Sequence, residues 1–278
     1  MLRALLTACS RIDVLNATVP NDTYRLTQGL AYGPEPRQQL DVYQPMSPDS
    51  ALGAKAAPLV VFFYGGSWSS GERADYRFVG EALASNGMVV VADYRLSPAV
   101  RYPVFLQDSA RALAWAIAQA TTLGANPRRV FAMGHSAGAY NAAMLALDPR
   151  WLAAEGLTPS QLAGWIGLAG PYDFFPIGDP LSQVAFNWPD TPADSQPMAH
   201  VSGKSPPALL LAAADDTVVN PQRSTLMLAQ RLRAVGVPVE AALFDGVGHA
   251  TLVASLAWVL RSRAPVLPRL LSFVNGLA

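Results

Sequence analysis

The chain has 278 residues, of which 51% are hydrophobic, and this combination is typical of one domain with a large apolar core. Twenty basic residues balance twenty acidic ones, so the chain lacks the basic field that attracts nucleic acid. A single cysteine, Cys9, excludes an intrachain disulfide and a cysteine-based zinc site. The three histidines show no metal-motif spacing, so we expect no bound metal ion.

The first nine residues allow two interpretations. Taken at face value, the stretch from Met1 to Cys9 begins an amphipathic helix, and the protein is cytoplasmic. Its Leu-Thr-Ala-Cys ending also resembles the lipobox of bacterial lipoprotein precursors, although the apolar run before it is shorter than the roughly 7–15 residues of a signal sequence. A late start codon that shortens such a signal would make the protein an exported lipoprotein. No other apolar run is long enough to span a bilayer.

Two short strands follow an N-terminal segment of about residues 1–25. Residues 26–32 and 39–43 flank a Gly-Pro-Glu-Pro turn, which predicts an antiparallel hairpin. Residues 58–64 then form a continuous apolar run of β-branched and aromatic side chains, as a buried parallel strand requires.

Helical and strand patterns alternate along the rest of the chain. Such alternation predicts an α/β fold with a mostly parallel central sheet and helices on both faces. The expected helices are residues 75–86, 104–123, 139–147, 221–235 and 250–261, and the expected strands are residues 88–92, 129–133, 164–169, 208–213 and 239–244.

The segment 171–207 interrupts this alternation, with eight prolines and little periodicity. A loop of that length inside a compact domain is usually functional or mobile, so we expect a small lid inserted into a single domain of residues 1–278. Its aromatic residues Phe174, Phe175, Phe186 and Trp188 are candidate walls of an apolar pocket. An alternative role for each is to pin the segment to the core.

The most specific pattern is Gly134-His-Ser-Ala-Gly138, which follows an apolar strand and precedes a helix. This arrangement is typical of a nucleophile elbow. The sharp turn forces Ser136 into a strained backbone conformation, and the flanking glycines let strand and helix pack closely. The same five-residue pattern occurs by chance in many proteins, so its place between a strand and a helix is what gives it weight.

A serine hydroxyl needs a base within hydrogen-bond reach to become a nucleophile, and the base needs a carboxylate to orient it. His135 lies inside the elbow and cannot turn back to its neighbour's hydroxyl, while His200 lies in the irregular segment. His249 follows a predicted strand through a glycine-rich approach. We therefore expect His249 to be the base.

The expected acid follows the strand at residues 208–213. The chain order Ser, Asp, His matches that of nucleophile-elbow enzymes. Asp216 begins a string that resembles the Asp-x-x-Val found after this strand in many hydrolases, so it is the preferred acid. Asp215 is the alternative.

A third requirement is a set of N–H donors for the negative charge of the tetrahedral intermediate, worth roughly 3–4 kcal/mol each. Residues 64–68, Tyr-Gly-Gly-Ser-Trp, come directly after a buried strand, and glycine lets main-chain amides point at a ligand. On its own, Gly-Gly after a strand is most often only a turn. We expect the amides of Gly66, Ser67 and Ala137 to form an oxyanion hole, with Trp68 in the pocket.

Together these strings resemble the α/β-hydrolase superfamily over about residues 40–261. The strings are Tyr64-Gly-Gly-Ser-Trp68, Asp93-Tyr-Arg-Leu96, Gly134-His-Ser-Ala-Gly138, Asp216-Thr-Val-Val219 and Gly248-His249. Within the superfamily, the chain is most similar to carboxylesterases related to hormone-sensitive lipase, and to kynurenine formamidase and feruloyl-esterase-like proteins. The resemblance implies an α/β-hydrolase fold and a cofactor-free hydrolase of a small-molecule ester. It also implies that Asp93 and Arg95 form a structural pair.

Tyr64 departs from the family pattern, which usually has histidine before the two glycines. The leading hypothesis is a serine carboxylesterase that hydrolyses short acyl esters through an acyl-enzyme intermediate. One alternative is an arylformamidase, because that group shares the Gly-Gly-x-Trp loop. Another is a hydrolase-fold binding protein without catalysis, against which the complete set Ser136, Asp216 and His249 argues.

Overall fold

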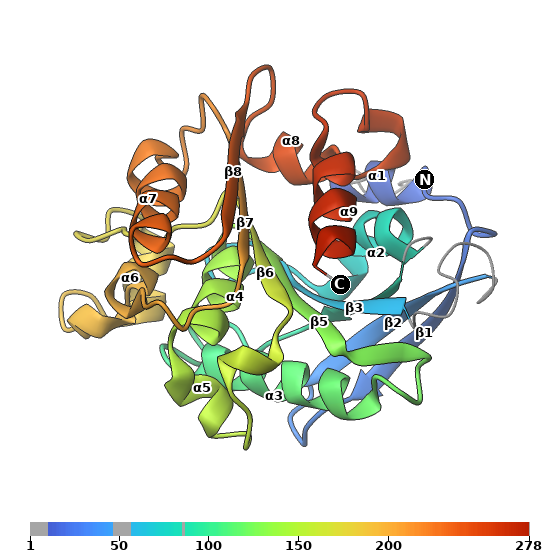
Figure 1. The fold of residues 1–278 in the computed structure, drawn as a ribbon, viewed down its shortest axis with the longest axis horizontal. Helices are drawn as coiled ribbons and strands as arrows, with labels where there is room; N and C mark the ends of the chain where they lie inside the picture. Colours follow the sequence, from blue (N-terminus) through green and yellow to red (C-terminus); the bar gives the residue numbers. More distant parts are fainter. Residues whose placement is uncertain (1–10, 47–56, 85–86, 278) are drawn as a thin grey trace, which may run out of the picture.

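The computed structural model describes residues 11–46, 57–84 and 87–277, and these form an eight-stranded sheet flanked by helices (Figure 1). Both expectations for the first nine residues lie outside the described residues. The strands are β1 Tyr24–Ala31, β2 Gln39–Pro45, β3 Ala57–Phe63, β4 Met88–Ala92, β5 Ala125–His135, β6 Gly164–Leu168, β7 Ala208–Ala213 and β8 Val239–Phe244. The helices are α1 Arg11–Ala17, α2 Arg77–Ala84, α3 Val104–Gln119, α4 Ala137–Leu147, α5 Pro149–Ala153, α6 Pro180–Phe186, α7 Met227–Ala234, α8 His249–Ala254 and α9 Val266–Gly276.

The sheet has the order β1-β2-β4-β3-β5-β6-β7-β8, and all pairs from β4 to β8 in this order are parallel. β1 and β2 pair antiparallel, as the predicted hairpin requires, and β2 also runs antiparallel to β4. α2 and α9 cover one face, while α3, α4 and α7 cover the other (Figure 1). Every residue of β3, β4 and β7 is therefore buried. The predicted mostly parallel α/β architecture is confirmed.

The predicted helix over 250–261 is wrong in its second half. α8 ends at Ala254, after which the Ser255 hydroxyl donates to the Leu252 carbonyl at 2.6 Å. The Leu256 carbonyl accepts a hydrogen bond from Arg261 Nε at 3.1 Å. These side-chain bonds take the place of helical ones, and the chain forms a short 3-10 turn. The helix α9 follows this turn and was not predicted from the sequence.

The segment 171–207 is more regular than its prolines indicated. It contains α6 and two single 3-10 turns, Ala193–Ser195 and Pro197–His200. Asp179 caps α6 by accepting the Ser182 N–H at 2.9 Å, and Pro180 occupies the first helical turn. The Asp-Pro pair was therefore a readable helix signal within the segment.

The carboxyl ends of the parallel strands meet at one edge of the sheet, because the strands are in register. Phe63 of β3 is paired with Gly134 of β5, and His135 of β5 with Leu168 of β6. The chain segments that leave β3, β5, β7 and β8 consequently start at the same edge. These are the segments that carry the predicted site residues.

The turn from β5 into α4 depends on backbone contacts that only glycine allows. A Cβ atom on Gly138 would lie 2.0 Å from the carbonyl oxygen of Phe63, and one on Gly134 would lie 2.1 Å from the carbonyl oxygen of Gly138. Both contacted atoms belong to the backbone of core elements, so neither can move aside. The strand, the helix and the neighbouring β3 thus touch without intervening side chains.

We expect Gly138→Ala to lower the free energy of unfolding by about 3 kcal/mol or more, because the added methyl group overlaps fixed backbone atoms. Gly276→Ala in α9 is the matched control, since a Cβ atom there meets nothing within 4 Å. Alanine favours the helix, so this control should keep or slightly raise stability. Urea unfolding followed by circular dichroism measures both, and equal losses in the two variants would contradict the close-packing argument.

Candidate active site

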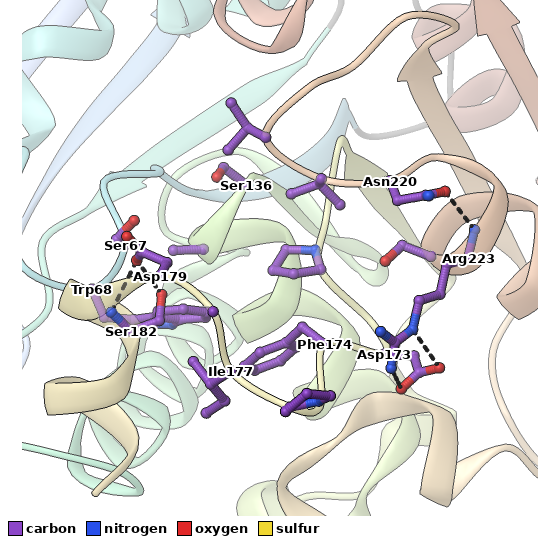
Figure 2. Close-up of a pocket in the computed structure, with 17 residues that line it drawn as sticks. Ser67, Trp68, Ser136, Asp173, Phe174, Ile177, Asp179, Ser182, Asn220 and Arg223 are labelled. Carbon is purple, nitrogen blue, oxygen red and sulfur yellow. Dashed lines mark hydrogen bonds and ion pairs between the residues drawn. The ribbon is translucent and has the colours of Figure 1, made fainter. Parts of the chain in front are cut away.

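Ser136 occupies the turn between β5 and α4 with φ 54° and ψ −122°, a conformation rare for any residue except glycine. Its N–H donates to the Leu168 carbonyl at 2.9 Å, and its own carbonyl accepts from the N–H groups of Ala139 and Tyr140. The strained residue is therefore held from both sides by backbone bonds. Ser136 lies at the edge of a cavity (Figure 2).

A chain of hydrogen bonds links three predicted residues. Ser136 Oγ lies 2.8 Å from His249 Nε2, and His249 Nδ1 lies 2.7 Å from Asp216 Oδ2. Asp215, the alternative acid, is exposed, and the structure brings Asp216 to the histidine instead. His200 is not part of this chain of hydrogen bonds, and its Nε2 lies 3.6 Å from Asp148 Oδ2.

Asp216 is held as an anion. Burial raises its pKa, but the hydrogen bond to His249 and the N–H groups of Val219 and Val218 outweigh this effect and leave the pKa below its ordinary value. The two N–H groups reach Asp216 Oδ1 at 3.0 and 2.8 Å, so the other oxygen faces the histidine. A fixed carboxylate in this place keeps the proton of His249 on Nδ1 and leaves Nε2 free to accept one from Ser136.

The loop after β3 lies beside Ser136 and has an unusual backbone conformation. Gly66, Ser67 and Trp68 have successive positive φ values of 117°, 49° and 56°. Glycine is required at 66, where a Cβ atom would lie 2.3 Å from the Ser70 carbonyl oxygen. Within the described part of the chain, the N–H groups of Gly66, Ser67 and Ala137 donate no backbone hydrogen bond. These amides are available to a ligand.

Tyr64, the departure from the family pattern, orients the start of this loop. Its hydroxyl donates to Asp93 Oδ1 at 2.9 Å and accepts from Arg37 Nη2 at 2.7 Å. Its carbonyl accepts from the Tyr94 hydroxyl at 2.8 Å, and its ring stacks between Tyr76 and Tyr94 at 5.6 and 4.8 Å. Burial, together with the charge of Asp93, raises the pKa of Tyr64, so the hydroxyl stays a neutral donor.

Asp93 and Arg95 are structural residues but do not pair with each other. Asp93 forms ion pairs with Arg73 and Arg37, whereas Arg95 Nη2 lies 2.8 Å from Asp108 Oδ1. The prediction that they form a pair is wrong, because the two side chains form ion pairs with different residues. Asp93 thereby stabilises the loop after β3 through its hydrogen bond with Tyr64.

A cavity of about 350 Å³ opens beside Ser136. Figure 2 shows Ser136 at its upper side, Ser67 and Trp68 with Asp179 and Ser182 on one flank, and Arg223 with Asp173 on the other. Residues from the loop after β3, the start of α4, the segment 171–182 and the segment 218–224 line it. The lining residues are Ser67, Trp68, Ser136, Ala137, Pro171, Asp173, Phe174, Pro176, Ile177, Gly178, Asp179, Ser182, Val218, Val219, Asn220, Arg223 and Ser224.

Two of the five candidate pocket aromatics line this cavity. Trp68 and Phe174 stack at 5.9 Å and form a continuous apolar wall. Phe186 is fully buried behind them, with its ring 4.7 Å from that of Trp68, so it supports the wall. Phe175 and Trp188 pack on each other at 5.4 Å, outside the lining. For the last three, the expectation of a cavity-facing ring is wrong, because side-chain packing turns each towards another ring.

The charged groups that line the cavity were not predicted from the sequence. Arg223 forms an ion pair with Asp173 at 2.9 Å, and its backbone N–H donates to Asn220 Oδ1 at 3.0 Å. Burial raises the pKa of Asp179, but hydrogen bonds from Ser182 and Ser67 leave it below the ordinary value, so a carboxylate faces the cavity. Only Asp179 carried a sequence signal, as the cap before Pro180.

His135 points away from Ser136 into the interior. Its Nε2 lies 3.0 Å from the backbone carbonyl oxygen of His249, and its Nδ1 has no hydrogen-bond partner among the described residues. Burial and the neighbouring charge of His249 lower the pKa of His135 to about 3. It is therefore a neutral side chain at ordinary pH.

In residues 11–46, 57–84 and 87–277, no three His, Cys, Asp or Glu side chains gather closely enough to hold a metal ion. The helices of these same ranges are too short or too polar to cross a bilayer.

The BD-FAE family model matches residues 40–232, well over half of the chain. The chain belongs to the BD-FAE family. It is 27% identical over 250 residues to isoprenylcysteine alpha-carbonyl methylesterase ICME of Arabidopsis thaliana, which covers 82% of this chain and 57% of that protein. It is 29% identical over 239 residues to esterase LipC of Mycobacterium tuberculosis, which covers 78% of this chain and 58% of LipC. The chain thus spans a little over half the length of these curated relatives.

Solved structures agree with the fold of this BD-FAE protein. Esterase B from Lactobacillus rhamnosis superposes with a TM-score of 0.80 at 21% identity, covering 96% of this chain and 92% of that one. EstE1, a carboxylesterase cloned from a metagenomic library, gives 0.72 at 22% identity, covering 95% and 93%. These likenesses confirm the predicted α/β-hydrolase fold.

The low pKa of His135 has a measurable effect on stability. The unfolded chain, in which a histidine has a pKa of about 6.5, binds the proton more readily than the folded protein. The free energy of unfolding therefore falls as the pH drops from about 6.5 towards 3. We expect His135→Gln to remove this contribution and to flatten the slope by up to about 1.4 kcal/mol per pH unit. Urea unfolding at several pH values measures the slope, and an unchanged slope would show that His135 is not a buried neutral group.

Proposed function

We propose that the protein is a serine carboxylesterase that hydrolyses short-chain acyl esters. The observation that supports this most directly is the hydrogen-bonded chain from Asp216 through His249 to Ser136 Oγ, which ends at the mouth of a cavity. The names of similar proteins point the same way, since ICME is a methylesterase, LipC and esterase B are esterases and EstE1 is a carboxylesterase.

In the proposed reaction, Ser136 Oγ attacks the ester carbonyl carbon while His249 Nε2 takes the hydroxyl proton. The carbonyl oxygen becomes an oxyanion, which the free amides of Gly66, Ser67 and Ala137 stabilise, at roughly 3–4 kcal/mol each. The carbon–oxygen bond to the alcohol then breaks, and His249 returns the proton to the leaving oxygen. Asp216 stays ionised and stabilises the imidazolium.

The second half of the reaction uses the same groups. Water attacks the acyl carbon, its proton passes to His249 Nε2, and the oxyanion again lies against the amides. Collapse of this intermediate breaks the bond to Ser136 Oγ, which recovers its proton from His249 and releases the carboxylic acid. No cofactor takes part in either half.

The walls of the cavity support a short acyl group. The indole N–H of Trp68 donates to Asn141 Oδ1 at 3.0 Å, which fixes the ring, and Phe174 stacks on it. Phe186 fills the space behind, so the wall cannot retreat without disturbing the core. Phe174, Ile177 and Asp179 come from the segment 171–207, which supports its proposed role as a lid over the site.

An arylformamidase is the second candidate. Trp68 and Phe174 present aromatic faces next to Ser136, and an aromatic substrate ring can stack on them. Comparing the turnover of N-formylkynurenine with that of p-nitrophenyl acetate separates the two candidates. A higher kcat/KM for the formamide would favour the arylformamidase.

We expect Ser136→Ala to lower kcat for p-nitrophenyl acetate by about 10⁶-fold and Asp216→Asn by about 10⁴-fold, because each breaks the hydrogen-bonded chain. Asp215→Asn is the matched control, since this exposed neighbour does not bond His249, and it should keep wild-type activity. A fluorophosphonate probe should label the wild type and not Ser136→Ala. Turnover independent of Ser136, or an unlabelled wild type, would overturn the proposal, and the second result would favour the binding-protein alternative.

We expect Phe174→Ala to shift the preference towards longer acyl chains, because it removes one side of the apolar wall. Each additional buried methylene contributes about 0.8 kcal/mol, so the kcat/KM ratio of octanoate to acetate esters should rise by about tenfold or more. Phe175→Ala is the control, because this ring packs on Trp188 outside the lining. An equal shift in both variants would show that Phe174 does not limit the acyl group.

A further inference from the structure

His135 is a buried titratable group that the proposed mechanism does not use. It lies next to Ser136 in the sequence, but its ring is directed towards the backbone of His249 rather than towards the cavity. The centroids of the two imidazole rings are 5.0 Å apart, and the rings are tilted by 47°. The ring nitrogens of His249 bond Ser136 and Asp216 rather than the His135 ring. The contact between the residues runs from the side chain of one to the main chain of the other.

The partner of His135 shows which ring nitrogen carries the proton. The atom that faces Nε2 is a carbonyl oxygen, which can only accept, so Nε2 must be the donor at 3.0 Å. Nδ1 has no hydrogen-bond partner in the described part of the chain, in accord with a neutral ring protonated on Nε2. The low pKa of His135 agrees with a neutral ring.

The bond connects a segment that follows an edge strand to a strand in the middle of the sheet. His249 begins α8 after β8, an edge strand whose residues are only partly buried or exposed. Hydrogen bonds of the preceding Gly248 run to Thr251 and Leu252 within the same short helix. His135, in contrast, belongs to β5 in the middle of the sheet and is 5% exposed.

The His135 ring is itself held in place. A Cβ atom on Gly65 would lie 3.1 Å from His135 Nδ1 and 2.9 Å from Ser136 Cβ, so the loop after β3 packs against both residues. The ring therefore lies between that loop and the His249 carbonyl. It cannot turn without displacing one of them.

We propose that His135 is a positioning residue that holds the backbone of His249 through its Nε2–H, so that the His249 imidazole stays within hydrogen-bond reach of Ser136 Oγ. The proposal rests on the proposed function of Ser136 and His249. Neither ring nitrogen of His135 touches the reacting atoms. The effect on the reaction passes entirely through the main chain of His249.

A pair of substitutions separates the hydrogen bond from the packing. In His135→Gln the side-chain amide nitrogen takes the place of Nε2 and still donates, whereas in His135→Met a side chain of similar length and volume has no donor. We expect His135→Met to lower kcat for p-nitrophenyl acetate by about 10- to 100-fold with little change in KM, because misplacement of the base affects chemistry rather than binding. His135→Gln should restore kcat to within about threefold of the wild type.

A second readout does not require turnover. The downfield proton resonance of the His249–Asp216 hydrogen bond should persist in His135→Gln and be lost or broadened in His135→Met. If the Met variant does not fold, His135→Asn replaces it, because its shorter amide cannot reach the His249 carbonyl. Urea unfolding confirms that the compared variants are folded.

The outcomes distinguish this proposal from the proposed function. Equal kcat in the Met and Gln variants, or a resonance that survives in both, would overturn the role of His135 while leaving the esterase intact. A wild type without Ser136-dependent turnover would overturn the esterase, and the resonance would then test the positioning by itself. A kcat loss restored by Gln, with the resonance following it, supports the proposal.

Discussion

The contact between the β5–α4 turn and the end of β3 is the constraint on which the rest of the site depends. Gly138 meets the Phe63 carbonyl so closely that even one methyl group has no room. This contact brings Ser136 beside the loop that leaves β3, so Ser136 and Ser67 line the same cavity. The same closeness forces Ser136 to a positive φ, and backbone hydrogen bonds on both sides sustain that strain.

A second, polar framework fixes the loop after β3. Tyr64 replaces the histidine usual in the family and hydrogen-bonds with Asp93 and Arg37, while Arg73 neutralises the same carboxylate. Burying such charges is expensive, and the arrangement is stable because every partner is satisfied at once. This framework holds the loop at three successive positive φ values. In that conformation, the N–H groups of Gly66 and Ser67 have no backbone acceptors in the described part of the chain.

The regular segments of the chain could be predicted from the sequence more accurately than the irregular ones. Strand ends and the glycines of the turn follow from local patterns, so the place of Ser136 and most strand ends could be predicted within one or two residues. The exception is β5, which begins at Ala125, four residues before the predicted start at residue 129. The ring directions of Phe175, Phe186 and Trp188 could not, because an irregular segment has no period that relates one side chain to the next. α8 ended early for a similar reason: Arg261 and Ser255 compete for backbone carbonyls that helical periodicity alone assigns to the helix.

The sequence by itself determined the fold class and the chain order of Ser136, Asp216 and His249, because each follows a strand whose apolar run is readable without neighbours. Only the tertiary structure decided that Asp216 rather than Asp215 faces the histidine, that Trp68 and Phe174 form the cavity wall, and that His135 reaches the backbone of His249. These outcomes depend on contacts between segments far apart in the chain. There, the direction of a side chain is set by packing and by the hydrogen bonds that buried polar atoms must form.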